Sequence, residues 1–203
     1  MTKAARFFYT VGALLLVQSC ATTEDPSPES TGPDSSTATD TLVPVSPSLT
    51  PGGPTNSRGA LEKVWGQPAG MGCDDQAQCD VNFVLDAPGD ATDCLESLPA
   101  ENGSLKAFPV GIETGSTFDP PAYGTILQSF DFVAITSSGL TVTSVSTDAS
   151  INCQESNSLP TTFSKGSKYE GFVVLDLPAD AASIAYVPSN SDGGWEWSLG
   201  PGR

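Results

Sequence analysis

The stretch YEGFVVLDL, residues 169–177, is the clearest β-strand in the chain and decides the predicted fold. It is rich in the β-branched and aromatic side chains that suit a pleated, buried surface. The turn-forming residues Lys165–Ser167 precede it, and Pro178 ends it. Proline and glycine at such places interrupt regular structure. From about residue 75 onward, we therefore expect a fold built of strands.

Further strands are expected on both sides of this stretch, because apolar and polar residues alternate there. They cover residues 81–85, 108–112, 130–135, 140–143, 183–187 and 195–199. Ser137–Gly139 predicts a hairpin turn. Pro109 and Gly111 predict that their strand lies at a sheet edge or contains a bulge. A turn of helix is expected at Ala60–Trp65, and no stretch of ten or more residues has a helical period.

About seven short strands with short connections predict an all-β fold, an antiparallel β-sandwich. The domain is expected to cover residues 58–203, which is long enough for one real core. The predicted core combines the alternating aliphatic residues with these aromatic side chains: Phe83, Phe108, Phe130, Phe132, Phe172 and Tyr186.

The first twenty residues predict export and lipidation. Lys3 and Arg6 precede the apolar run Phe7–Val17, which is too short to cross a bilayer as a helix but suits an export signal. Leu16–Cys20 looks like a lipobox, although Gln18 replaces the small residue usual at its place. A plain signal peptide cut nearby, or a buried strand, is the alternative. We expect residues 1–19 to be a lipoprotein signal peptide and several acyl chains on Cys20 to anchor the protein outside the cytoplasm.

Residues 20–57 are predicted to be a disordered tether. Ser, Thr, Pro, Gly and Asp dominate them, and the few apolar residues have no period. Such a segment buries too little apolar surface to offset the entropy of ordering. The tether would hold the folded domain away from the membrane surface.

Composition excludes several classes of function. The chain has 24 acidic and 8 basic residues and a formal charge of −16, so it repels nucleic acid. It contains no histidine, which removes Ser-His and Cys-His nucleophile pairs, an imidazole base and histidine metal ligands. An enzyme built from this chain would have to use carboxylates, lysine or tyrosine.

Four cysteines remain once Cys20 is assigned to lipid, and they allow three disulfide pairings. We favour one disulfide across the short loop from Cys73 to Cys79. The other would join Cys94 to Cys153 across a long loop. Oxidation is the default outside the cytoplasm, and no CxxC spacing supports a zinc site.

Four segments resemble an uncharacterised actinobacterial family of immunoglobulin-like lipoprotein domains, similar to a mycobacterial secreted immunoprotective antigen. The segments are Cys94–Thr114, Ser150–Pro160, Gly166–Pro178 and Gly193–Trp197. The resemblance covers about residues 80–199. It implies an immunoglobulin-like sandwich and supports the pairing of Cys94 with Cys153. It implies no activity and no cofactor.

Two sets of residues are candidates for binding. Trp195 and Trp197 share one face of a strand; exposed, they would bind a sugar or a protein, but their alternation with polar residues favours the core. Trp65, outside the strand pattern, is the better candidate for an exposed aromatic side chain. Three loop carboxylates are candidate calcium ligands, although they lack the usual spacing of a calcium loop: Asp86, Asp90 and Asp93.

The sequence therefore predicts a cell-surface lipoprotein that presents an acidic immunoglobulin-like domain. Its expected contacts are the membrane, through Cys20, and a protein or glycan partner that the sequence does not name. No catalytic residue and no cofactor is assigned. The alternative is a carboxylate- or cation-dependent extracytoplasmic enzyme.

Overall fold

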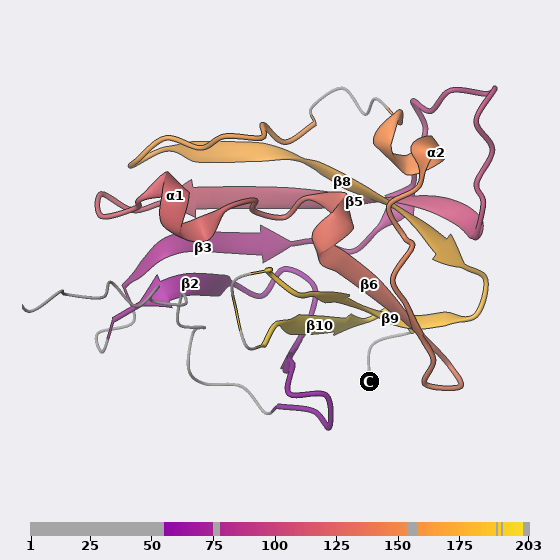
Figure 1. Ribbon diagram of the computed structural model, residues 1–203, viewed down its shortest axis with the longest axis horizontal. Helices are drawn as coiled ribbons and strands as arrows, with labels where there is room; N and C mark the ends of the chain where they lie inside the picture. Colours follow the sequence, from indigo (N-terminus) through magenta and orange to yellow (C-terminus); the bar gives the residue numbers. More distant parts are fainter. Residues whose placement is uncertain (1–54, 75–77, 154–157, 190, 192, 201–203) are drawn as a thin grey trace, which may run out of the picture. The chain divides into compact units, whose positions relative to one another are not determined.

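The computed structural model describes residues 55–74, 78–153, 158–189, 191 and 193–200, which form a sandwich of two β-sheets (Figure 1). The first, the β5 sheet, contains β2 (Ala69–Cys73), β3 (Cys79–Leu85), β4 (Gly89–Asp90), β5 (Gly103–Thr114) and β8 (Lys168–Pro178). The second, the β9 sheet, has the order β1 (Leu61–Lys63), β10 (Trp195–Ser198), β9 (Ala181–Tyr186), β6 (Phe132–Thr136) and β7 (Thr141–Val142). The predicted all-β sandwich is confirmed.

The pairing is antiparallel throughout the described strands except for β1, which runs parallel to β10. The helical elements are single turns: α1 (Pro120–Tyr123), the 3-10 turn η1 (Ser129–Asp131) and α2 (Asp148–Ile151). In the described part of the chain, no helix has the length and apolar character needed to span a membrane.

β8 contains the stretch that decides the fold, and it pairs with almost the whole length of β5. The strand is buried on both faces from Val173 to Leu177. One face joins the main core, while Val174, on the other face, packs with Ala107 and Cys153 in a second apolar cluster. Burial on both faces explains why the apolar run is nearly continuous instead of alternating.

Aromatic side chains join the two sheets in the main core. Phe83 of the β5 sheet packs edge-on against Tyr186 and Trp195 of the β9 sheet, with ring centroids 5.7 Å and 5.0 Å apart. Tyr186 and Trp195 stack on each other at 5.7 Å. Such pairs contribute about 0.5–1.5 kcal/mol each beyond the burial of their area. Aromatic rings from both sheets therefore pack together in the core between them.

Two local predictions were wrong near the ends of elements. Ala60–Trp65 was expected to be a turn of helix, but Leu61–Lys63 forms β1 because Leu61 pairs with Trp195 at the sheet edge. Phe130 was expected in the core, but its side chain is 61% exposed. The chain turns at η1 before β6 begins, so Phe130 is outside the strand alternation.

Pro109 was expected to mark an edge strand or a bulge, yet β5 is an inner strand between β3 and β8. The carbonyl of Pro109 accepts a hydrogen bond from the N–H of Asp86, so the proline nitrogen faces the same side. There β3 has just ended at Leu85 and β4 begins only at Gly89. The missing N–H of proline therefore faces a break in the neighbouring strand and costs no ladder hydrogen bond.

Candidate functional site

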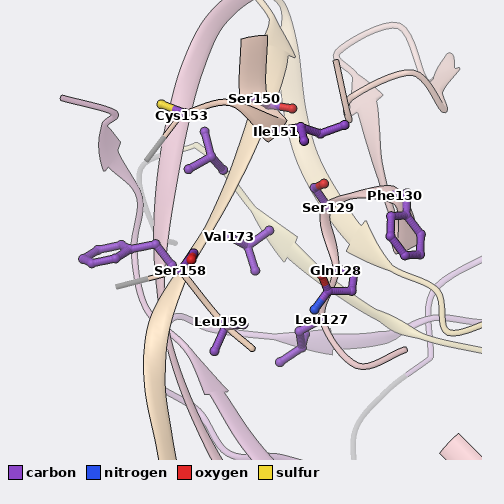
Figure 2. A pocket seen from close by; sticks show the side chains of 12 residues that line it. Leu127, Gln128, Ser129, Phe130, Ser150, Ile151, Cys153, Ser158, Leu159 and Val173 are labelled. Carbon is purple, nitrogen blue, oxygen red and sulfur yellow. The ribbon is translucent and has the colours of Figure 1, made fainter. Parts of the chain in front are cut away.

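A pocket of about 220 Å³ lies beside β8, η1 and α2 (Figure 2). Its walls come from four separate segments of the chain, and the lining is mainly apolar with a few hydroxyl and amide groups. The residues that line it are Leu127, Gln128, Ser129, Phe130, Ser150, Ile151, Cys153, Ser158, Leu159, Phe172, Val173 and Val174. None of these side chains is charged.

The rim of the pocket carries two of the most exposed large apolar side chains in the described chain. Phe130 is 61% exposed and Ile151 is 62% exposed. They come from η1 and α2, and Figure 2 shows both of them near Ser129. Isolated exposed apolar residues are ordinary, whereas these two border one pocket, which makes the pocket the candidate site.

A buried carboxylate positions the α2 wall. Asp176 of β8 is fully buried and accepts hydrogen bonds from the backbone N–H of Glu101, at 2.6 Å, and of Asn102, at 3.2 Å. It also accepts one from the Thr147 hydroxyl, at 3.1 Å. Thr147 is the N-cap of α2 and forms a capping box with Ser150. The Asp176 carboxylate of β8 thus fixes the start of α2 through Thr147. It also satisfies backbone N–H groups that would otherwise be buried without hydrogen-bond partners.

A disulfide holds the other end of α2. Cys94, in the segment before β5, is bonded to Cys153, which lines the pocket directly after α2. A second disulfide joins Cys73 to Cys79 across the β2–β3 hairpin. These are the pairings favoured from the sequence. Cys20, the predicted lipidation site, and the predicted tether up to residue 54 lie outside the described residues.

The tryptophans predicted as binding candidates do not form an exposed surface. Trp195 and Trp197 are both 0% exposed, so the core interpretation holds and a surface binding role for them is wrong. Trp65 is half-buried and stacks on Trp197, with ring centroids 6.3 Å apart, and lies 5.9 Å from Phe108. It therefore covers the core at the end of β1 instead of standing free as an exposed aromatic residue.

The predicted calcium ligands are not brought together. Asp86, Asp90 and Asp93 are exposed, and Asp90 forms an ion pair with Lys106 at 2.5 Å. Among the described residues, no three acidic or cysteine side chains gather closely enough to hold a metal ion. The expectation of a cation site in this loop is wrong, because the strand pairing of β4 directs Asp90 toward Lys106 on β5.

Titratable groups with shifted pKa values lie apart from the pocket lining. Burial raises the pKa of Tyr123 well above its usual range, and the hydrogen bond from its hydroxyl to Asp80, at 2.6 Å, adds to this. Burial also raises the pKa of Asp131, although a hydrogen bond from Thr125 opposes it. Neither Tyr123 nor Asp131 lines the pocket. Among its described residues, the pocket lining therefore contains hydroxyl groups but no acid or base.

The pocket was missed by sequence reasoning. Its walls lie between residues 127 and 174, in segments that no local pattern connects. The one local signal was Phe130, an aromatic residue directly before a charged one at the start of a strand, and it was assigned to the core. Ile151 lies in the segment Ser150–Pro160 that resembles the lipoprotein family, and no pattern around it indicated a binding site.

The fold and the pocket define a disulfide-containing β-sandwich protein with a surface pocket whose described lining combines apolar side chains with hydroxyl and amide groups. No family model matches the chain, and no curated protein matches it. The chain is similar to MPT63, a secreted protein from Mycobacterium tuberculosis whose crystal structure is known, with 14% sequence identity and a TM-score of 0.45. The match covers 68% of this chain and 97% of MPT63. At this identity the likeness concerns the fold alone.

Proposed function

We propose that this chain is an exported, lipid-anchored β-sandwich module that binds a partner through the pocket beside β8, and that it is not an enzyme. The observation that carries the proposal is the pocket with its two exposed apolar side chains, Phe130 and Ile151. Aromatic and aliphatic anchors around a pocket are the usual centre of a protein interface. The pocket supports the expectation from the sequence that the domain is presented for binding or structural interaction.

The chemistry of the pocket favours binding over catalysis. Its serine hydroxyls are the only groups of a nucleophilic type, and a serine needs an adjacent base to act as a nucleophile. The hydroxyl of Ser129 shares a hydrogen bond with that of Ser146, at 2.7 Å, while the hydroxyl of Ser150 completes the capping box of α2 with Thr147. These contacts give the hydroxyls of Ser129 and Ser150 structural partners. The carboxylate-based enzyme is the weaker candidate, because no carboxylate is among the described residues that line the pocket.

The export and anchor part of the proposal rests on the N-terminal sequence. A short basic region, an apolar run and a lipobox-like ending at Cys20 follow in the order of a lipoprotein signal. The two disulfides are the kind of bond that persists outside the cytoplasm. The resemblance to a lipoprotein family points the same way.

The anchor is tested by mass spectrometry of the mature N-terminus. We expect an acylated Cys20 as the first residue and its loss from the membrane fraction in Cys20→Ser. An unmodified chain that begins elsewhere would overturn the anchor while leaving the pocket untouched.

The binding role is tested by proximity labelling on intact cells with the tethered protein. Phe130→Asp and Ile151→Asp are expected to remove specific labelled partners that the wild type captures. Leu140→Asp is the matched control, because Leu140 is 64% exposed but lies in the β6–β7 hairpin outside the pocket lining. Identical labelling by all three variants and the wild type would contradict a binding role for the pocket.

A further inference from the structure

We infer that residues 55–63 form a strap that opens from the β9 sheet as a unit, and that Arg58 latches it by holding two facing carboxylates together. The carboxylates belong to Glu62 on the strap and to Glu196 on β10. The strap follows directly after the predicted tether, so the latch decides where the tether ends. That consequence rests on the lipid anchor proposed above, whereas the latch itself does not.

The strap is joined to the sheet over a short length. Its strand, β1, pairs in parallel with β10 over three residues, and a bridge between Thr55 and Leu61 folds the strap back on itself (Figure 1). Leu61 is the strap residue that belongs to the main core. Opening of the strap therefore uncovers one aliphatic core side chain, whereas global unfolding uncovers the whole core. A segment of this kind can open at a lower free energy than the fold as a whole.

Two carboxylates face each other across β1 and β10. Glu62 and Glu196 are partners in the strand register. Leu61 and Trp195, the preceding pair, belong to the main core, so both glutamates lie on the outer face of the β9 sheet. Like charges directly opposite each other on one face destabilise a strand pair. By themselves, these two carboxylates would push the strap off the sheet.

Arg58 supplies the opposite charge from within the strap. Its guanidinium forms an ion pair with Glu196, and its Nε also donates to the Glu196 carboxylate at 3.0 Å. The hydrogen bond to Glu196 raises the pKa of Arg58 against the opposing effect of burial, and the negative charges of Glu196 and Glu62 raise it further. One guanidinium therefore interacts favourably with both carboxylates and removes the cause of their repulsion.

Glu196 is held in place for this contact. Ser183, on β9, donates its hydroxyl to Glu196 at 2.6 Å, and Asn56, on the strap, donates its side-chain amide at 2.6 Å. Glu196 is 9% exposed, and a carboxylate buried to this extent needs such partners. The sheet thus presents Glu196 as a fixed attachment point for two side chains of the strap.

Release of the strap would lengthen the predicted tether. Fully extended, residues 55–63 add roughly 30 Å, at about 3.3 Å for each residue. The two disulfides and the pairing of β8 with β5 lie outside the strap and would stay intact. The latch therefore sets the distance between the proposed anchor and the folded domain.

The latch is tested by amide hydrogen exchange, followed by NMR on the full mature chain with Cys20→Ser and intact disulfides. The N–H of Leu61 donates to the carbonyl of Gly194 at 2.9 Å and reports opening of the strap. The N–H of Asp176 donates to the carbonyl of Val145 at 2.9 Å and reports the rest of the sandwich. Each rate is expressed relative to that of the unfolded chain. In the wild type, Leu61 should exchange faster than Asp176 and depend less on urea, because less surface is exposed when the strap opens.

Arg58→Gln is the latch variant, and Lys106→Gln is its matched control because it removes the ion pair with Asp90 on the other sheet. Leu61 should exchange about tenfold faster in Arg58→Gln, since charged hydrogen bonds are lost and the two carboxylates still face each other. Lys106→Gln should leave the exchange of Leu61 unchanged. Adding Glu62→Gln to Arg58→Gln should slow the exchange again, by about threefold, because the repulsion is removed.

Trypsin provides a second measurement. Arg58 is the first lysine or arginine after Arg6, so cleavage after Arg58 cuts the predicted tether from the domain. In the closed strap its side chain is bound to Glu196. Glu196→Gln should speed this cleavage about fivefold, because proteolysis follows the population of the open form.

Two results would overturn the inference. The same exchange rate and urea dependence at Leu61 and Asp176 would show that the strap opens only with the whole fold. An equal effect of Glu62→Gln with and without Arg58 would show that Arg58 does not join the two carboxylates. Neither measurement involves the lipid, so an unmodified Cys20 would refute the anchor and the change in tether length while leaving the latch in place.

Discussion

Gly72→Ala is expected to reduce the free energy of unfolding by about 3–4 kcal/mol, which is an unusually large cost for adding one methyl group. Gly72, in β2, has φ +63°, a conformation that costs an L-residue about 1–2 kcal/mol. A Cβ placed there would lie 1.9 Å from the hydroxyl oxygen of Tyr123 and 2.8 Å from a carboxylate oxygen of Asp80. The Tyr123–Asp80 hydrogen bond would have to break, at about 1.5–3 kcal/mol for a bond to a charged group.

Gly166→Ala is the matched control. Gly166 has φ +61°, nearly the same backbone conformation, but no atom lies within 4 Å of its added Cβ. Its cost should therefore be the backbone term alone, about 1–2 kcal/mol. Both variants are compared with the wild type by urea unfolding of the mature chain with Cys20→Ser, using the midpoint at constant m-value.

Tyr123→Phe separates the two terms for Gly72. Removing the hydroxyl removes the closest clash, and the ring carbon behind it, 3.1 Å from the added Cβ, needs to move by only a few tenths of an ångström. The double variant should therefore lose at least about 1 kcal/mol less than the sum of the two single losses. The reasoning would be refuted if Gly72→Ala cost no more than Gly166→Ala, or if the double variant were simply additive.

Three further outcomes are expected from the same unfolding assay. Burial raises the pKa of Glu196, but hydrogen bonds from partners including Arg58 outweigh it and leave the pKa below its ordinary 4.5. The stabilising ion pair is therefore present above about pH 5 and is lost as the pH falls through the lowered pKa. Glu196→Gln should reduce the free energy of unfolding by about 1 kcal/mol at neutral pH, as for a partly exposed pair, and this difference from the wild type should vanish in acid. A difference that grows below pH 4 would contradict this. Replacing Cys94 and Cys153 together by serine should cost about 4 kcal/mol, because their bond closes a loop with a sequence separation of 59. Replacing Cys73 and Cys79, with a separation of 6, should cost about 2 kcal/mol, and the reverse order of the two losses would exclude the loop-entropy explanation.

The strands that were predicted correctly have their cause in the local sequence. The hairpin at Ser137–Gly139 has a glycine with φ +85° at its turn, and residues 169–177 lie in β8, the strand that their apolar and β-branched side chains predict. In these places the burial of each residue follows from its neighbours in the same strand. Alternation therefore reports the structure directly.

The errors occur where a distant segment decides the local structure. Phe130 continues the apolar run of β6, but Asp131 is held by Thr125 and accepts the N–H of Val187 at its carbonyl, so the chain turns before the strand starts. Pro109 is tolerated in an inner strand because the neighbouring strand is interrupted opposite it. Neither cause can be seen in the residues around the mispredicted one.

By itself, the amino-acid sequence determined the all-β class, the main strands, the acidic charge and the lack of histidine chemistry, and the lipid anchor at Cys20 stays a prediction from the sequence. Each of these depends on composition or on a period of two residues along the chain. Only the tertiary structure decided that Trp195 and Trp197 are core, that Asp86, Asp90 and Asp93 do not come together as a cation site, and that a pocket lies beside Val174. Those properties depend on which segments meet, and the long-range pairing of β8 with its neighbours brings the walls of the pocket together from sequence positions that no local pattern links.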